Sequence, residues 1–244
     1  MSRTETFPVL GFDLASVTLD EAAGLLLRAA GSPAGSTFVV TLNPEIVVRS
    51  QTDAELRAAL QSADLTVADG VGVLWAARRA GYVLPGRVPG VDLVCRLMEL
   101  GGSGLRVFFL GGKPGVAERA AAEAARRWGV IPAGHMHGYF DAQLEGADVA
   151  ARVAQARPDL LLAGLGESQE LFLARHREAL GARVLVGVGG TLDVLAGEVR
   201  RTPEWTRRLN VEWAWRVGLD RSRWHRFPRL LDFVRLVLAA PRHG

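Results

Sequence analysis

The sequence predicts an α/β protein of the Rossmann-like class, with a mainly parallel sheet that helices cover on both faces. The first 199 of the 244 residues alternate between short apolar runs and longer segments with helical periodicity. Each apolar run is continuous, as in strands covered on both faces, and ends at Gly, Asn or Asp. A hydrophobic fraction of 49% and a charged fraction of 23% are typical of globular chains and exclude wholesale disorder.

The expected elements follow one another in a regular order. The strands are expected at residues 36–43, 64–69, 105–112, 158–166 and 182–190. The helices, whose apolar residues recur at spacings of three and four, are expected at residues 19–30, 44–62, 70–81, 90–100, 115–128, 145–156 and 168–179. No repeat of 20–50 residues interrupts this pattern.

Residues 200–244 differ in composition from the rest of the chain. They contain eleven arginines and four acidic residues, and four of the six tryptophans. We therefore predict a core over residues 1–199 and a basic, Trp-rich helical appendage over residues 200–244. Such a segment suits an anionic membrane surface or nucleic acid, and the alternative is a solvated helical face or packing on the core.

The chain carries few signals for export or membrane insertion. Its single cysteine, Cys95, excludes a disulfide framework and indicates a reducing compartment. The first sixteen residues lack the apolar core of a signal peptide, and no stretch approaches the roughly eighteen uncharged apolar residues of a spanning helix. We expect a soluble, cytoplasmic protein.

The carboxyl ends of the expected strands hold the best candidates for a site, because ligands bind at that edge of a parallel sheet. Four of the five ends bear glycine and precede a helix, including Gly111-Gly112 and Gly189-Gly190. Backbone amides and helix N-termini there suit a diphosphate. The full G-x-G-x-x-G and P-loop patterns are absent, so tight strand-to-helix turns explain the glycines equally well.

Polar side chains stand at two other strand ends. Asp69 ends an apolar strand, where a carboxylate can act as a general base or can serve as a turn or N-cap residue. Thr41 and Asn43 can hydrogen-bond a polyhydroxyl substrate, or Asn43 can cap the next helix. Arg87 can bind anionic oxygen through its guanidinium, with surface solvation as the alternative.

A metal centre is only weakly indicated. His135 and His137 would share a face of a strand, but no cysteine and no obvious third ligand lies near them. The chain contains no Asp-x-Asp pair, the device that clamps a divalent metal onto a sugar nucleotide. We expect neither a metal nor a cofactor.

Nine motifs follow one another along nearly the whole chain. They are T-L-N-P-E-I-V (41–47), A-D-L-T-V-A-D-G-V-G-V (63–73), R-V-P-G-V-D-L (87–93), F-L-G-G-K-P-G-V (109–116), H-G-Y-F (137–140), G-L-G-E-S-Q-E (164–170), G-V-G-G-T-L-D-V-L-A-G (187–197), R-R-T-P-E-W (200–205) and N-V-E-W-A-W-R (210–216). In this order they resemble the WecB/TagA/CpsF glycosyltransferase family (glycosyltransferase family twenty-six). One departure is Glu167-Ser168, where the family usually has a small residue, Pro and Lys.

The resemblance implies an activity and a place in the cell. It implies an inverting, metal-independent transfer of a sugar, N-acetylmannosamine in the best-known members, from a UDP-sugar to an undecaprenyl-diphosphate-linked sugar. Teichoic acid, enterobacterial common antigen and exopolysaccharides are made in this way. It also implies an appendage that contacts the inner face of the bacterial plasma membrane. Nucleic-acid binding through the tail and NAD-dependent oxidation on the same fold class are the competing interpretations.

The resemblance also assigns roles to residues. The catalytic aspartate of the family falls on Asp69, and its sugar-contacting threonine and asparagine fall on Thr41 and Asn43. Its diphosphate-binding arginine falls on Arg87 and its pocket glutamine on Gln169. The region expected around UDP contains Gly111, Gly112, Tyr139, Gly189 and Gly190. The implied partners are the UDP-sugar, the polyprenyl-diphosphate-linked acceptor and an anionic membrane, with no nucleic acid, and self-association of the chain is a conjecture.

Overall fold

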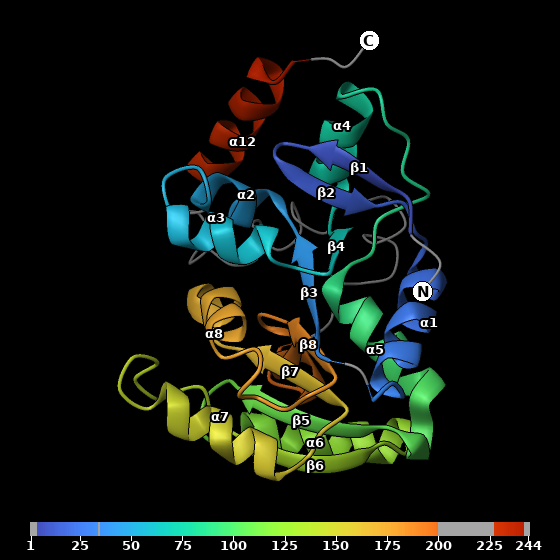
Figure 1. Ribbon diagram of the computed structural model, residues 1–244, viewed down its shortest axis with the longest axis vertical. Helices are drawn as coiled ribbons and strands as arrows, with labels where there is room; N and C mark the ends of the chain where they lie inside the picture. Colours follow the sequence, from blue (N-terminus) through green and yellow to red (C-terminus); the bar gives the residue numbers. More distant parts are fainter. Residues whose placement is uncertain (1–3, 34, 200–226, 242–244) are drawn as a thin grey trace.

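A computed structural model describes residues 4–33, 35–199 and 227–241 (Figure 1). The strands are β1 (Thr6–Val9), β2 (Phe12–Ala15), β3 (Thr37–Leu42), β4 (Leu65–Ala68), β5 (Arg106–Gly111), β6 (Ile131–Met136), β7 (Leu160–Gly164) and β8 (Val184–Gly187). They form a sheet in the order β1-β2-β4-β3-β8-β7-β5-β6, and every pair except the β1–β2 hairpin is parallel. The predicted Rossmann-like α/β class is confirmed.

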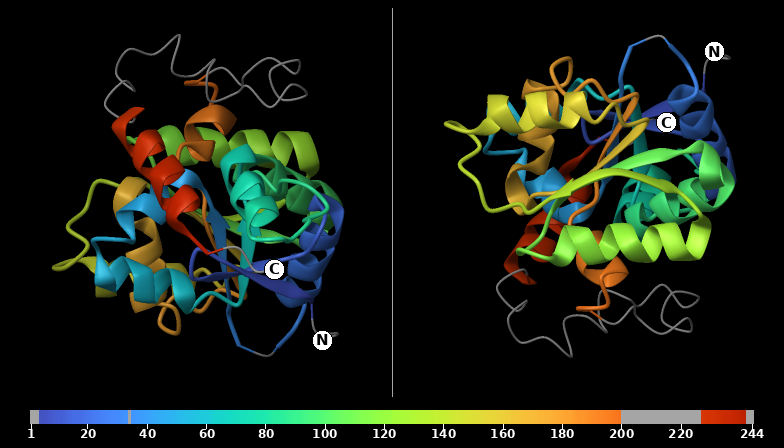
Figure 2. Two further views of the ribbon diagram at one scale, coloured as in Figure 1. Left: turned by 90° about the horizontal axis from the view of Figure 1, so that it is seen from above. Right: turned by 90° about the horizontal axis from the view of Figure 1, so that it is seen from below.

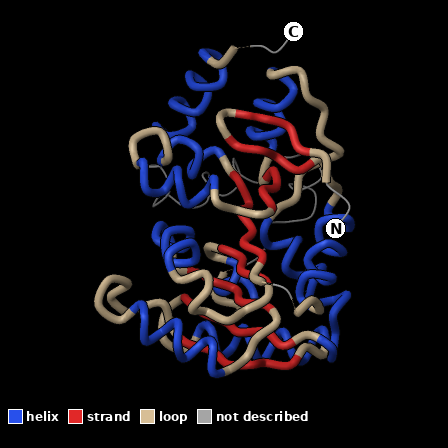
Figure 3. Tube along the Cα trace, in the orientation of Figure 1, coloured by secondary structure: helices blue, strands red, loops and turns tan. Residues whose placement is uncertain are grey.

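Helices cover both faces of this sheet (Figures 2 and 3). They are α1 (Leu19–Ala30), α2 (Pro44–Arg49), α3 (Ala54–Gln61), α4 (Val71–Arg79), α5 (Gly90–Gly101), α6 (Val116–Trp128), α7 (Gly146–Gln155), α8 (Gln169–Arg175), α9 (Thr191–Leu195) and α12 (Phe227–Ala239), with short 3-10 turns η1 (Gly102–Gly104) and η2 (Gly166–Ser168). Phe109 of β5 lies in the core under α1, α5, α6 and α9, whereas its neighbour Leu110 lies in the core on the opposite face. This two-sided burial explains the continuous apolar runs of the strands.

Three strands escaped the sequence prediction. β1 and β2 are only four residues long and contain polar residues, so they lack the continuous apolar run of a covered strand. β6 lies at the edge of the sheet, and its sequence I-P-A-G-H-M is exposed or half-buried throughout. A proline is tolerated there because an edge strand does not need every backbone donor.

The predicted helix 44–62 is wrong as a single element, because the chain breaks it into α2 and α3. α2 ends at Arg49 with Ser50 as its C-cap, and Asp53 is the N-cap of α3, where its side chain accepts a hydrogen bond from the backbone N–H of Leu56 at 2.8 Å. An aspartate N-cap stabilises a new helix start by about 1 kcal/mol. The predicted helix 168–179 is also shorter in the structure, where α8 ends at Arg175, and the helix expected after Gly189-Gly190, for which no bounds were predicted, is the short α9.

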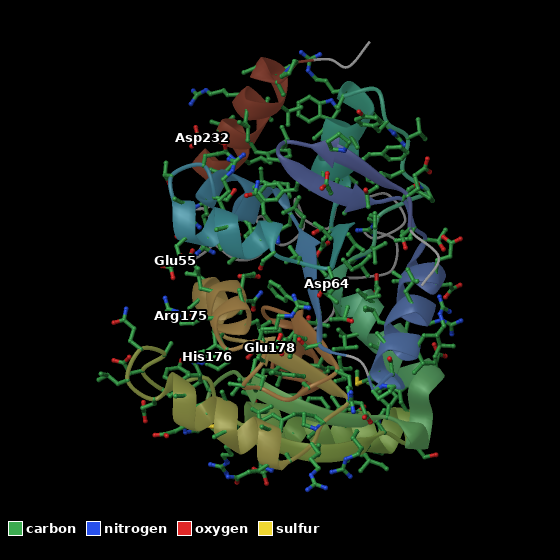
Figure 4. All side chains as sticks on the ribbon, viewed as in Figure 1. Glu55, Asp64, Arg175, His176, Glu178 and Asp232 are labelled. Carbon is green, nitrogen blue, oxygen red and sulfur yellow. The ribbon has the colours of Figure 1, made fainter. Side chains whose placement is uncertain are left out.

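An ion pair joins α3, the helix before β4, to α8, the helix before β8. Arg175 of α8 donates to Glu55 of α3 at 2.5 Å, and Figure 4 shows the two side chains between these helices. Arg177 pairs with Asp64 at 2.5 Å, and the Asp64 carboxylate also accepts from the backbone N–H of Phe38 in β3. These contacts fix α8 and the loop after it against β3, α3 and the start of β4.

The helix α12, predicted as part of the appendage, packs on the core. Its Phe233 and Val237 are buried, and the Phe233 ring lies 3.2 Å from where a Cβ on Gly72 would stand. Arg79 of α4 donates to the carbonyl oxygens of Val237 and Leu238 at 3.1 and 3.0 Å, which satisfies the C-terminal end of α12. The predicted packing alternative therefore applies to this helix.

The opposite side of α12 faces outward. The sequence of the tail predicts one apolar face of short helices, formed by Trp213, Val217, Leu219, Leu230, Leu231, Val234 and Leu238. In α12, Leu230 and Val234 are half-buried, whereas Leu231 and Leu238 are 47% and 55% exposed. Trp213, Val217 and Leu219 lie outside the described residues. The division at residue 199 into a core and an appendage stays a prediction. Within the described ranges, none of the helices has both the length and the apolar composition needed to cross a membrane.

Candidate active site

The carboxyl ends of the parallel strands all lie on one side of the sheet. The predicted site residues fall into two groups along these strand ends. The polar stretch, next to the ends of β3 and β4, contains Thr41, Asn43, Asp69 and Arg87. The glycine stretch, formed by the turns after β5, β6, β7 and β8 and the start of α8, contains Gly111, Gly112, Tyr139, Gln169, Gly189 and Gly190. Because β3 and β8 are paired, the two stretches adjoin.

Asp69 lies at the centre of the polar stretch. Its backbone N–H donates to the Leu42 carbonyl oxygen at 2.8 Å, which continues the ladder between β4 and β3 by one residue. Its half-buried carboxylate accepts from the backbone N–H of Gly90 at 3.2 Å. Gly90 begins α5, a helix without a side-chain cap of its own, so Asp69 occupies its positive N-terminal end. The aspartate thus caps α5, a helix 21 residues further along the chain, while the N-cap of α4, the helix that follows it in sequence, is Gly70.

The Thr41 side chain approaches Gly90 from the neighbouring strand, β3. Its Oγ1 lies 3.1 Å from where a Cβ on Gly90 would stand, so the absence of a side chain at this glycine lets the hydroxyl approach the helix start. Thr41 pairs with Val67 in the parallel register of β3 and β4. Two strand ends and one helix start therefore bring a hydroxyl and a carboxylate together, which is an arrangement suited to binding a hydroxyl group and accepting its proton.

Asn43 and Arg87 flank this pair. The Asn43 side-chain oxygen accepts from the backbone N–H groups of Glu45 and Ile46 at 3.0 and 3.1 Å, so the predicted capping of the following helix is confirmed. Arg87 is half-buried in the loop before α5. The backbone N–H of the next residue, Val88, donates to the carbonyl oxygen of Ala68 at 2.7 Å, which holds this loop beside the end of β4. Contacts of Asn43 with a sugar and of Arg87 with a diphosphate stay predictions.

The glycine stretch is built from backbone in close contact. A Cβ on Gly111, where φ is +136°, would stand 2.3 Å from the Gly164 carbonyl oxygen. A Cβ on Gly164 would stand 2.8 Å from the Gly189 carbonyl oxygen. The N–H of Gly112 donates to Gly164 at 3.2 Å, and the N–H of Gly138 donates to Gly112 at 2.9 Å. These glycines are required by the approach of strand ends to one another, which tight turns alone do not explain.

Tyr139 follows directly on this network. Its side chain is 65% exposed, and its backbone N–H donates to Nδ1 of His137 at 3.3 Å. An exposed aromatic ring beside a row of backbone N–H groups suits stacking on a nucleotide base. This role of Tyr139 stays a prediction. In the part of the chain that the structure describes, no group of three or more His, Cys, Asp or Glu is placed to hold a metal ion, so His135 and His137 gain no third ligand there.

Gln169, the first residue of α8, is buried within the glycine stretch. Its Oε1 accepts from the backbone N–H of Gly189 at 2.9 Å, and its Nε2 donates to Glu170 at 2.6 Å. Burial raises the pKa of Glu170, while the hydrogen bond from Gln169 and the charge of Arg49 act in the opposite direction. Glu170 was not among the predicted site residues; the available signal was an acidic residue directly before the apolar run Leu171–Ala174 of α8.

The residue that departs from the family pattern makes contacts of its own. Arg229 of α12 donates to Glu45 at 2.7 Å and to Glu167 at 3.0 Å. Arg49 donates to the backbone carbonyl of Glu167 at 2.8 Å. Through these contacts Glu167 joins η2 to α12 and α2. Pairwise contacts between distant segments of this kind leave no local sequence signal.

Comparison with known proteins shows the family of the chain that carries this site. A family model described as the glycosyl transferase WecG/TagA/CpsF family matches residues 7–243. The chain belongs to this family. Two N-acetylglucosaminyldiphosphoundecaprenol N-acetyl-beta-D-mannosaminyltransferases of Staphylococcus aureus, from strains MRSA252 and NCTC 8325 / PS 47, are each 34% identical to it over 232 residues. The match covers 94% of this chain and 89% of each relative.

Membership in the WecG/TagA/CpsF family makes the chain a glycosyltransferase, as the resemblance of its motifs implied. The family match reaches from the β1–β2 hairpin to residue 243, so it includes both stretches of the site and the helix α12. The donor, the acceptor and the roles of individual residues are matters for a proposal.

Proposed function

We propose that this chain transfers N-acetylmannosamine from a UDP-sugar to an undecaprenyl-diphosphate-linked sugar, with inversion at the anomeric carbon and without a metal ion. The acceptor and the sugar follow from the names of relatives that are 34% identical over 94% of the chain. The observation that carries the proposal is the convergence of the Asp69 carboxylate and the Thr41 hydroxyl on Gly90, at the ends of adjacent parallel strands.

In the proposed reaction, Asp69 acts as the general base. The acceptor hydroxyl oxygen forms a bond to the anomeric carbon from the face opposite UDP, its proton passes to the Asp69 carboxylate, and the bond from that carbon to the diphosphate oxygen breaks. Asp69 can hold its bond from Gly90 during this step, because a carboxylate has about four acceptor positions. The Thr41 hydroxyl and the side-chain nitrogen of Asn43 orient the sugar.

The departing UDP carries the negative charge that the site must stabilise. The Arg87 guanidinium and the backbone N–H groups around Gly111-Gly112 and Gly189-Gly190 supply this stabilisation. The exposed ring of Tyr139 stacks on the uracil base. This division gives the acceptor to the polar stretch and the donor to the glycine stretch.

The acceptor lipid requires the protein to meet a membrane surface. We propose a peripheral position on the inner face of the bacterial plasma membrane, through residues 200–244. The outward side of α12 supports this, since Leu231, Arg235 and Leu238 are exposed there. An arginine near an anionic surface contributes about 1 kcal/mol. Flotation with anionic liposomes tests it: L231E/L238E lowers binding and preserves the buried Phe233 face, whereas unchanged binding would contradict a contact through α12.

The proposed donor is tested by calorimetric titration with UDP in the presence of EDTA, with NAD as the control ligand. We expect UDP to bind and NAD not to bind. Binding that requires an added divalent cation would overturn the metal-independent mechanism. Binding of NAD without UDP would overturn the proposed donor and favour the oxidoreductase interpretation.

A further inference from the structure

The first two residues of α8 have an unusual environment. Gln169 and Glu170 begin this helix, yet both are buried, with 8% and 7% of their surface exposed. They reach under the end of β8: a Cβ on Gly187 would stand 2.9 Å from the Gln169 Nε2 and 3.2 Å from the Glu170 Oε1. A buried amide and a buried carboxyl are costly unless their polar atoms are satisfied, so their partners indicate what they do.

The two side chains allow only one orientation of the Gln169 amide. The oxygen accepts from the N–H of Gly189 at 2.9 Å and the nitrogen donates to the Glu170 carboxyl at 2.6 Å. While Glu170 is ionised, a flipped amide would place its oxygen against a carboxylate that accepts only, and its N–H groups against the N–H of Gly189. Glu170 therefore fixes the amide, and the amide fixes the backbone of Gly189.

Gly189 in turn governs the neighbouring strand ends. It has φ of +50° in the turn between β8 and α9, and its carbonyl oxygen is the atom against which Gly164 packs. Gly164 packs against Gly111 in the same manner. A displacement of the Gly189 turn is therefore transmitted across the glycine stretch.

We propose that Gln169 and Glu170 are a buried positioning pair that sets the Gly189-Gly190 turn for the nucleoside diphosphate of the donor. Gln169 acts through Gly189 and does not itself touch the sugar. This inference rests on the proposed function, because it takes a UDP-sugar as the donor of this site.

Single substitutions disturb the pair in a defined way. Gln169→Glu places two carboxyl groups against each other, and we expect it to weaken UDP binding about tenfold, the size of one charge-assisted hydrogen bond. Glu170→Gln retains an acceptor oxygen for Gln169 and stays within about threefold of the wild type. Glu170→Leu removes that acceptor and again weakens UDP binding about tenfold.

The exchanged pair Q169E/E170Q separates positioning from direct contact. Its carboxylate at position 169 accepts from Gly189 and from the amide at position 170, so both contacts are retained, although the hydrogen bond between positions 169 and 170 runs in the opposite direction. We expect UDP affinity within about threefold of the wild type. If the Gln169 amide touches the substrate, this exchange does not rescue binding. Glu178→Gln, the same chemical change at an exposed residue after α8, is the matched control and leaves UDP affinity unchanged.

The experiment measures the UDP dissociation constant by calorimetry and the midpoint of thermal unfolding for every variant. Recovery of UDP affinity in the exchange relative to Gln169→Glu supports the pair. Wild-type affinity in Gln169→Glu, or no recovery in the exchange while it unfolds like the wild type, would overturn it. If Gln169→Glu does not fold, the comparison of Glu170→Leu with Glu170→Gln decides in its place. A wild-type chain that binds no UDP would instead refute the proposed donor.

Discussion

The polar stretch of the site is built from side chains, whereas the glycine stretch is built mainly from backbone. In the polar stretch, the Thr41 and Asp69 side chains meet at Gly90, and a hydrogen bond of 3.2 Å holds the carboxylate. In the glycine stretch, backbones approach so closely that a Cβ on Gly111 would stand 2.3 Å from a carbonyl oxygen. Substitution in the polar stretch should therefore remove chemistry and leave the fold, whereas substitution of the closely packed glycines should disturb the fold itself.

The largest expected effect is that of Gly111→Val. The new side chain meets the Gly164 carbonyl and forces a φ of +136° on a β-branched residue. Overpacking and backbone strain each cost about 1–3 kcal/mol, so we expect a loss of about 2–6 kcal/mol in the free energy of unfolding. Chemical denaturation measures it. Gly104→Val, where a Cβ meets nothing within 4 Å, is the control, and an equal loss in both would refute the steric argument.

Phe233→Ala tests whether α12 supports the polar stretch. The ring packs at the position next to Gly72, close to the side chain of Pro44, and these residues follow Asp69 and Asn43. Truncation of a buried phenylalanine costs about 3–5 kcal/mol, and we expect weaker transfer with unchanged UDP affinity. Leu231→Ala on the exposed side of the same helix should cost little. A selective loss of UDP affinity in Phe233→Ala would place α12 with the glycine stretch instead.

Glu170 gives the glycine stretch a dependence on pH. Because burial raises its pKa in the folded chain, Glu170 stabilises the fold fully only below its unfolded pKa, near 4.5. This contribution is lost as the pH rises through the folded pKa. Relative to Glu170→Gln, the wild type should therefore lose unfolding free energy with rising pH. Denaturation of both proteins from pH 4 to 8 measures it, and a constant difference would contradict the raised pKa.

The smallest expected effect is at the contact between α12 and η2. Glu167 and Arg229 are 3.0 Å apart but partly exposed, and pairs of this kind contribute about 0.2–1 kcal/mol. A double-mutant cycle with Glu167→Gln and Arg229→Gln measures this coupling. The exposed pair Asp232–Arg235 within α12 is the matched control. A coupling of several kcal/mol would show that this contact governs the docking of α12.

The sequence predicts those features of the fold and the site that depend on a local pattern of residues. Continuous apolar runs predict the covered strands, and their glycine or polar ends predict the edge at which the site lies. The β1–β2 hairpin and β6 escaped because short and edge strands need no such run. The capping of α5 by Asp69 and the link from Gln169 to Gly189 join residues about twenty positions apart, and no periodicity encodes them. An aspartate at position 69 suits both helix capping and general-base catalysis. Only the groups that its carboxylate contacts can distinguish the two roles.

The most direct test of the division between the two stretches is Asp69→Asn, measured for transfer and for UDP binding in parallel. The asparagine oxygen can still accept from Gly90, so the fold and the UDP affinity should remain those of the wild type, while the rate of transfer falls about 10²- to 10⁴-fold. Unimpaired transfer in this variant would contradict the role of Asp69 as general base. An equal loss of UDP binding would contradict the assignment of donor and acceptor to separate stretches.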